Sequence, residues 1–193
     1  MKLKIYCIGG SNTYGHDPRS YIGSRYPEEI RWTDRLKDCA AVNFGVNGMT
    51  VPNDAAYLID AIKREESGDE AQELIVVMLG TNDLLEGKSA GQITDRMAEF
   101  LTSLSEANKP ILLIAPPLLQ SGEWVQCETV RAESQNLRER YHELAAKAGY
   151  LFADAGEGGI EMTFDGVHFS PAGHAAFAQK LENRIREAYA TPK

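Results

Sequence analysis

The sequence predicts an α/β fold of the flavodoxin-like class, a three-layer α/β/α sandwich around a five-stranded parallel sheet. Two observations lead to this prediction. Short apolar runs rich in Ile, Val and Leu alternate with longer amphipathic segments, which is the pattern of a parallel sheet covered by helices on both faces. Small polar and titratable residues follow several of these runs, as expected where parallel strands end at a ligand site.

The apolar runs are short enough to be strands. Residues 74–79 and 111–115 are continuously apolar and residues 3–8 mostly so, which is typical of strands buried on both faces. The remaining two runs are weaker, the second run along the chain being the weakest. The expected strands are 3–8, 41–44, 74–79, 111–115 and 150–153.

The amphipathic segments between the strands are predicted to be helices. Pro27, Pro52 and Pro171 lie near three of the expected starts, where a fixed φ and a missing N–H are tolerated. Gly149 is expected to end the fourth helix and Gly68 the second. The expected helices are 28–38, 53–66, 92–107, 130–148 and 171–189. The length fits one compact domain over residues 1–193.

Charge and hydropathy exclude two classes of partner. The formal net charge is -8 and the sequence pI is about 5.1, which argues against a nucleic-acid partner because that affinity comes from Lys and Arg. Only Lys2 and Lys4 precede the first apolar run, which soon reaches Gly9. We therefore expect no signal peptide, no membrane partner and a cytoplasmic location.

Cysteine and histidine spacing gives no sign of a metal site or a disulfide framework. The three cysteines, Cys7, Cys39 and Cys127, have no CxxC spacing, so we expect them to be packing residues. His168 and His174 lie six residues apart in a segment that contains a proline, and this spacing does not place two ligands on one helical face. No metal is expected.

No cofactor is expected either. No GxGxxG motif follows a predicted strand. Gly10 and Gly15 have the Gly-x4-Gly spacing, but His16 and Asp17 stand where a phosphate-binding loop needs Lys and Ser or Thr. Thr13 replaces the second glycine of an α/β-hydrolase elbow.

Three residues have the chemistry of nucleophilic catalysis. Ser11 follows the first strand across two glycines, although a lone serine there is usually a helix cap. Asp165 and His168 lie three apart in a Gly-containing loop. There the carboxylate can bond one ring nitrogen and leave the other free for a serine. A plain surface loop is the alternative.

Two further residues follow strand ends. Asn82 comes after Gly80 and Thr81, where its amide can donate to a developing oxyanion, or alternatively serve as a cap or an Asx turn. Gly48 lies in a predicted turn. Because glycine has no side chain, its backbone N–H can approach a ligand closely. The alternative is an ordinary turn glycine.

Four blocks of the sequence together resemble a known family. In order and spacing they resemble the signature blocks of the SGNH (GDSL-like) hydrolases. The blocks are residues 9–15 (GGSNTYG), 43–50 (NFGVNGMT), 80–83 (GTND) and 165–170 (DGVHFS). The resemblance spans almost the whole chain, with one departure: Gly10 stands where the family usually has aspartate. That aspartate is not a triad member, so its loss bears on turn rigidity and rate more than on mechanism.

The resemblance implies a role for each residue. It makes Ser11 the nucleophile, His168 the general base and Asp165 the partner of His168. It implies that the oxyanion is held by the backbone N–H groups of Ser11 and Gly48 and by the side chain of Asn82.

Two long polar loops, residues 16–27 and 116–128, bear on the substrate. We assign Asn12 and Trp124 to substrate binding. Trp124 and three tyrosines can stack on a sugar or aryl ring, or pack as a lid. These tyrosines are Tyr14, Tyr21 and Tyr26. The run 23–27 (GSRYP), followed by Arg31, Trp32 and Leu36, resembles the small bacterial arylesterase and carbohydrate acetylesterase branch of the family.

The resulting expectation is a serine esterase that hydrolyses short-chain, foremost acetyl, esters of small molecules or sugars through an acyl-enzyme. No apolar stripe suggests a lipid-binding lid. A thioesterase or acyltransferase with the same triad remains an alternative, as does a non-catalytic small-molecule binding domain. The expected partner is a small-molecule ester, and a homo-oligomer is left open.

Overall fold

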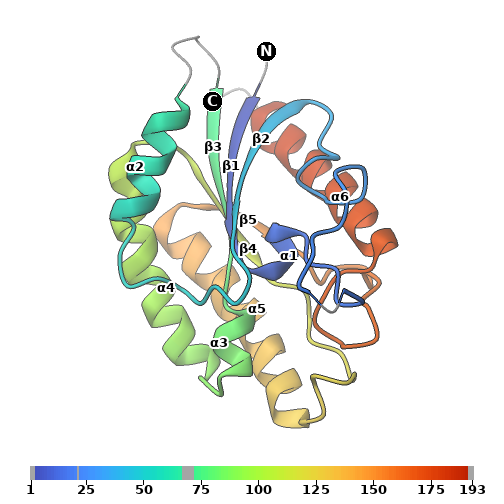
Figure 1. Cartoon of the computed structure of the whole chain (residues 1–193). Helices are drawn as coiled ribbons and strands as arrows, with labels where there is room; N and C mark the ends of the chain where they lie inside the picture. The colour runs from blue at the N-terminus through green and yellow to red at the C-terminus, as the bar shows by residue number, and fades with distance from the viewer. Residues whose placement is uncertain (1–2, 21, 67–71, 191–193) are drawn as a thin grey trace.

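A five-stranded parallel sheet forms the centre of the molecule in the computed structural model, which describes residues 3–20, 22–66 and 72–190. The strands are β1 (Leu3–Gly9), β2 (Cys39–Gly45), β3 (Gln72–Met78), β4 (Ile111–Ala115) and β5 (Leu151–Asp154). Their order in the sheet is β2-β1-β3-β4-β5, which is the flavodoxin-like order. Figure 1 shows the sheet between two layers of helices. The predicted fold class is confirmed, as are all five predicted strands.

Four of the five predicted helices are confirmed, and two short ones were not predicted. The long helices are α2 (Ala56–Glu65), α4 (Ala90–Leu104), α5 (Glu128–Ala148) and α6 (Pro171–Ala190). The short helices are α1 (Ser11–Tyr14) and α3 (Thr81–Leu85), and a 3-10 turn η1 (Ser105–Ala107) extends α4. Gly149 ends α5 in the left-handed conformation with a φ of 76°, as predicted. Gly68 lies outside the described residues.

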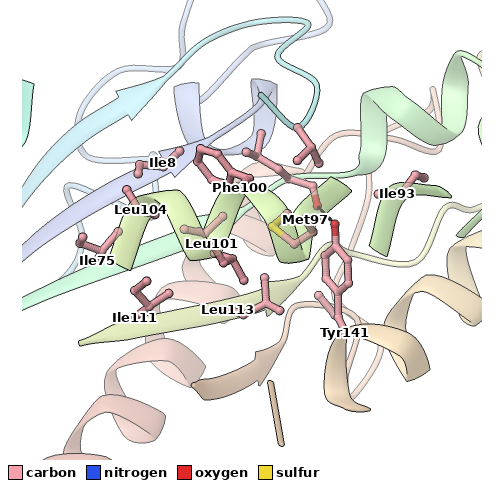
Figure 2. Close-up of a cluster of buried hydrophobic side chains, with 14 of the residues drawn as sticks. Ile8, Ile75, Ile93, Met97, Phe100, Leu101, Leu104, Ile111, Leu113 and Tyr141 are labelled. Carbon is pink, nitrogen blue, oxygen red and sulfur yellow. Dashed lines mark hydrogen bonds between the residues drawn. The ribbon is translucent and has the colours of Figure 1, made fainter. Parts of the chain in front are cut away.

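Two hydrophobic cores cover the two faces of the sheet. Helices α2, α4 and α5 pack on one face and α6 on the other (Figure 1). Alternate residues of β1 enter the two cores, Tyr6 and Ile8 the first, Ile5 and Cys7 the second. Figure 2 shows the first core, where Phe100 and other α4 side chains lie against the strands. The strands are apolar on both faces because both faces are buried.

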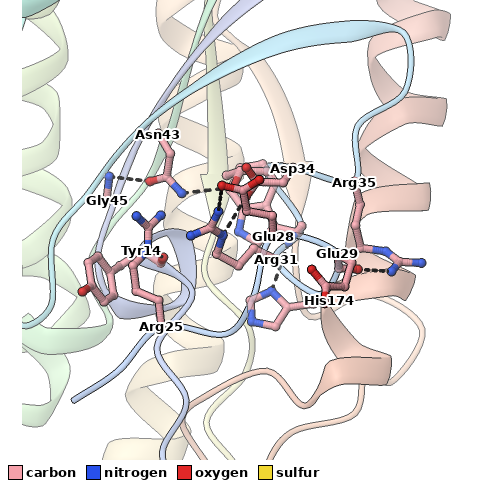
Figure 3. Close-up of polar contacts among 12 residues, drawn as sticks. Tyr14, Arg25, Glu28, Glu29, Arg31, Asp34, Arg35, Asn43, Gly45 and His174 are labelled. Carbon is pink, nitrogen blue, oxygen red and sulfur yellow. Dashed lines mark hydrogen bonds and ion pairs between the residues drawn. The ribbon is translucent and has the colours of Figure 1, made fainter. Parts of the chain in front are cut away.

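The predicted helix at residues 28–38 is wrong, because this segment forms two separate turns. The backbone N–H of Asp34 bonds the carbonyl of Arg31 at 3.1 Å. Within the second turn, the N–H of Trp32 donates to Nδ1 of His174 at 3.4 Å instead of to a carbonyl four residues back. Figure 3 shows this histidine and the ion pair of 2.7 Å between Arg31 Nε and Asp34 Oδ2. The continuous ladder that defines a helix is therefore interrupted.

The spacing of apolar residues explains the wrong prediction. Trp32 and Leu36 lie four apart and are both buried in the second core, as they would be on a helix face. Trp32 packs edge-on against Phe177 of α6, with ring centroids 5.1 Å apart. Two turns held by such contacts bury Trp32 and Leu36 just as a helix would. The apolar spacing alone therefore does not distinguish the two structures, and tertiary packing decides between them.

The cysteines differ in environment. Cys7 is buried in the second core, as predicted, and Cys39 is half-buried. Cys127 is exposed directly before α5, so its prediction as a packing residue is wrong. Within the described ranges, no helix has the length and apolar character needed to cross a membrane.

Candidate active site

Ser11 lies at the carboxyl end of the central part of the sheet. It is the first residue of α1, two residues beyond the end of β1, and β1 lies between β2 and β3. The turn requires glycine at position 9, since a Cβ there would lie 2.1 Å from Oγ1 of Thr13. The tight turn places the Ser11 side chain, which is 8% exposed, at the edge where ligands bind in open α/β sheets.

A chain of hydrogen bonds joins Ser11 to the loop before α6. Nε2 of His168 lies 2.8 Å from Oγ of Ser11. Nδ1 of the same ring lies 2.6 Å from Oδ2 of Asp165. His168 and Asp165 are both buried. The three side chains that the sequence singled out as nucleophile, base and orienter are thus in direct contact.

The surroundings of Asp165 keep it ionised. Burial alone would raise the pKa of this carboxyl, but the His168 ring and the backbone N–H groups of Val167 and His168 lower it below its usual range. The Thr163 hydroxyl lowers it further by donating to Oδ1 at 2.7 Å. An ionised Asp165 holds the proton on Nδ1 of His168. Nε2 is then free to accept the hydroxyl proton of Ser11.

Asn82 reaches the same place from α3. It shares a small cavity with Ser11, which is also lined by Gly10, Met49 and Pro117. Nδ2 of Asn82 donates to the carbonyl of Met49 at 2.9 Å. Because an amide nitrogen carries two hydrogens, a second donor remains for a ligand.

Gly48 lies in the turn after β2. It is exposed and has a φ of 73°, a conformation that favours glycine. No heavy atom lies within 4 Å of a Cβ built there, so the backbone at this position is open to a ligand.

Asn12, which the sequence assigned to substrate binding, is bonded within the protein. The residue is 6% exposed. Nδ2 donates to the carbonyl of Val167 at 2.9 Å, and Oδ1 accepts from the N–H of Phe169 at 2.8 Å. These bonds join Asn12 to the segment that carries His168, and its contact with the substrate stays a prediction.

Two aromatic rings flank His168. Trp124 is 56% exposed, and its ring lies edge-on to the His168 ring with centroids 5.3 Å apart. His16, which the sequence did not single out, lies 4.8 Å from the same ring. Burial, and then the charge of His168, lower the pKa of His16, which favours a neutral ring. Its only sequence signal is its position directly after the first signature block.

The tyrosines of the loops are placed differently from one another. Tyr26 is buried, which matches lid packing and not substrate stacking. The ring of Tyr14 is covered by the guanidinium of Arg25 at 4.6 Å. Tyr21 lies outside the described residues.

Among residues 3–20, 22–66 and 72–190, no three His, Cys, Asp or Glu side chains are grouped as a metal ion would require.

A family model agrees with this geometry. The model of the GDSL-like lipase/acylhydrolase family matches residues 7–176, which include Ser11, Asn82, Asp165 and His168. The chain belongs to this family. As a GDSL-like acylhydrolase, it is an enzyme that hydrolyses esters.

Solved structures share the fold of this acylhydrolase. An aryl esterase from M. smegmatis is 24% identical, with a TM-score of 0.80, and the match covers 95% of this chain and 98% of that one. A proposed arylesterase from Agrobacterium tumefaciens is 28% identical, with a TM-score of 0.79 and coverage of 97% and 99%. A carbohydrate acetylesterase from Sinorhizobium meliloti is 24% identical, with a TM-score of 0.79 and coverage of 96% and 99%. A comparison with curated proteins finds no match.

Proposed function

We propose that this acylhydrolase is a serine esterase that removes short acyl groups, foremost acetyl, from small-molecule or sugar esters through an acyl-enzyme intermediate. The observation that supports this most directly is the buried chain of hydrogen bonds from Asp165 through His168 to Ser11. Nucleophile, base and orienter within hydrogen-bond reach of one another are the signature of nucleophilic acyl transfer.

The first half-reaction forms the acyl-enzyme. Nε2 of His168 takes the hydroxyl proton of Ser11 as Oγ attacks the ester carbonyl, and the carbonyl oxygen becomes an oxyanion. His168 then gives this proton to the leaving oxygen as the ester bond breaks, which releases the alcohol. Asp165 stabilises the imidazolium that exists between these two transfers.

The second half-reaction reverses the first with water as the nucleophile. His168 takes a proton from water, the hydroxide attacks the acyl carbon, and Ser11 Oγ leaves with the proton from His168. In both steps we assign the oxyanion to three donors: the N–H groups of Ser11 and Gly48 and the free hydrogen on Nδ2 of Asn82. Donors that are fixed before charge develops supply much of the stabilisation in such reactions.

The cavity beside Ser11 and Asn82 supports the assignment of the oxyanion. Its volume is about 10 Å³, which is room for about one water-sized group, and the carbonyl oxygen of an ester fits this space. The similarity to a carbohydrate acetylesterase supports a short acyl group. Beside His168, the exposed ring of Trp124 offers a flat surface to a sugar or aryl leaving group.

The first experiment compares wild type with Ser11→Ala on p-nitrophenyl acetate, butyrate and octanoate and on an acetylated sugar. We expect turnover to be highest for acetate and absent in Ser11→Ala, because no other nucleophile among the described residues is bonded to Nε2 of His168. Circular dichroism checks that the variant is folded. Folded wild type that turns over thioesters but none of these esters would instead identify a thioesterase. Turnover that survives in Ser11→Ala would refute the assignment of the nucleophile.

A further inference from the structure

The amide of Asn12 connects the two ends of the chain at the active site. Asn12 directly follows Ser11, while its two hydrogen-bond partners, Val167 and Phe169, stand on either side of His168. Ser11 and His168 are 157 positions apart in the sequence. Their side chains meet only because these two distant segments are held at a fixed separation.

Few other hydrogen bonds join these two segments in the described part of the chain. In the described part of the chain, the hydrogen bonds between residues 11–15 and residues 163–170 are those of Asn12 and the Ser11–His168 bond itself. The backbone of Asn12 is also held, because its carbonyl accepts the indole N–H of Trp32 at 2.9 Å. Both the backbone and the side chain of Asn12 are therefore fixed by hydrogen bonds.

The two hydrogen bonds of the Asn12 side chain require an amide. The partners are one backbone carbonyl and one backbone N–H, both belonging to buried residues. A carboxamide supplies one donor and one acceptor from the same planar group, whereas an ionised carboxylate only accepts and an aliphatic side chain does neither. Loss of the amide leaves two buried backbone groups unpaired, and the segment is then free to shift.

We propose that Asn12 is a positioning residue that holds His168 at proton-transfer distance from Ser11. This inference rests on the proposed function of the same site. The Asn12 amide bonds the backbone of Val167 and Phe169, so it acts through the backbone on both sides of His168.

The expected consequence lies in proton transfer and not in substrate affinity. A displacement of about 1 Å at a reacting group costs roughly 100-fold in rate, so kcat should fall by about that factor while KM stays unchanged. The loss should depend on the leaving group. An alkoxide needs a proton from His168 as it departs, whereas p-nitrophenolate leaves as a stable anion without one.

The test compares wild type and Asn12→Leu on ethyl acetate and p-nitrophenyl acetate. Leucine has the same number of side-chain heavy atoms as asparagine but no polar atom. We expect kcat to fall for both esters, and we expect kcat/KM, which reports the acylation step in which the leaving group departs, to fall further for the ethyl ester. If Asn12→Leu does not fold, Asn12→Asp replaces it. Asp keeps the size and the acceptor for Phe169 but loses the donor to Val167, and the same pattern is expected.

Ser103→Ala is the matched control. Its hydroxyl accepts from the backbone N–H of Ala55 at 3.2 Å, which ties α4 to the start of α2 on one face of the sheet. This variant also loses a side-chain bond to the backbone, so it should lower thermal stability. It should keep the kcat of wild type for both esters.

Three results would overturn the inference: an unchanged kcat in a folded Asn12 variant, a raised KM with kcat intact, or an equal loss of kcat/KM for both esters. A raised KM would make Asn12 a substrate-binding residue. Ser11→Ala in the same assay separates this inference from the proposed function. Activity that survives in Ser11→Ala overturns both, whereas activity lost in Ser11→Ala and kept in Asn12→Leu overturns only the role of Asn12.

Discussion

At the scale of single residues, the glycine at position 10 gives Asn82 the space it occupies. A Cβ at Gly10 would lie 2.9 Å from Nδ2 of Asn82 and 3.5 Å from the carbonyl oxygen of Met49. The first distance is shorter than a carbon and a nitrogen tolerate, so Asn82 would have to turn away. The aspartate that the family usually carries at this position brings the same Cβ. In this chain, glycine at position 10 therefore leaves the space in which Asn82, the proposed oxyanion donor, lies.

Gly10→Ala should lower kcat by about 10- to 100-fold without unfolding the protein, because it displaces the Asn82 amide by a fraction of an ångström to about 1 Å. Asn82→Ala should cost roughly 100- to 1,000-fold, as the loss of an oxyanion donor does elsewhere. Steady-state kinetics on p-nitrophenyl acetate measures both.

The double variant decides whether the two residues act together. If Gly10→Ala acts only through Asn82, adding it to Asn82→Ala should cause little further loss, since coupled residues are not additive. Two losses that multiply in full would show that position 10 affects the reaction by another route.

At the scale of elements, the sequence predicted the sheet better than the segments that surround the site. Runs such as Leu74 to Met78 are apolar on both faces, and burial of both faces leaves few alternatives to a central strand. The segment 28–38 was misjudged because an acceptor from α6, Nδ1 of His174, interrupts its helical bonding. Local periodicity contains no information about such a distant partner.

The same reasoning applies to the site. Ser11, Asp165 and His168 were predictable because each follows a strand in a recognisable block, and their contacts agree with that reading. The helices α1 and α3 are one turn long, too short for a periodic pattern. The tie made by Asn12 and the contact of His16 with His168 depend on tertiary geometry, so sequence alone did not identify them.

Replacing glycine by alanine is expected to change the free energy of unfolding in opposite directions at the end of α5 and at the start of α4. Gly149 ends α5 with a φ of 76°, a conformation that costs alanine about 1 kcal/mol. Gly91 lies in the first turn of α4, and a Cβ there meets its nearest atom at 3.8 Å. Gly149→Ala should therefore lower the free energy of unfolding by about 1 kcal/mol, and Gly91→Ala should raise it by roughly 0.4–1 kcal/mol.

Urea unfolding at pH 7, followed by circular dichroism, measures both values. Destabilisation by Gly91→Ala would contradict the space found around that residue. An unchanged stability in Gly149→Ala would mean that the end of α5 rearranges without cost.

At the scale of the whole molecule, burial of His174 makes stability depend on pH. Burial, followed by the charges of His168 and Arg35, lowers the pKa of His174 from 6.5 to about 4. Between these values the unfolded chain binds a proton that the folded chain does not. The free energy of unfolding is therefore highest above pH 6.5 and falls as the pH drops toward 4, by about 3 kcal/mol in total from this residue.

His174→Asn should remove this part of the pH dependence. Asparagine does not titrate, and its side-chain oxygen can still accept the N–H of Trp32, which His174 Nδ1 accepts in wild type. Urea unfolding of both proteins at pH 7 and pH 4.5 gives the comparison. Equal losses of stability on acidification in the two proteins would show that His174 is not the group responsible.

The separation of the proposed catalytic residues along the chain also bears on the folding of the enzyme. Ser11 belongs to the first strand-helix unit, whereas Asp165 and His168 directly precede α6. During translation, Ser11 leaves the ribosome long before Asp165 and His168, and the proposed site is incomplete until the segment that carries them docks beside β1. A nascent chain that has already formed β1, β2 and β3 therefore carries a serine without its proposed base.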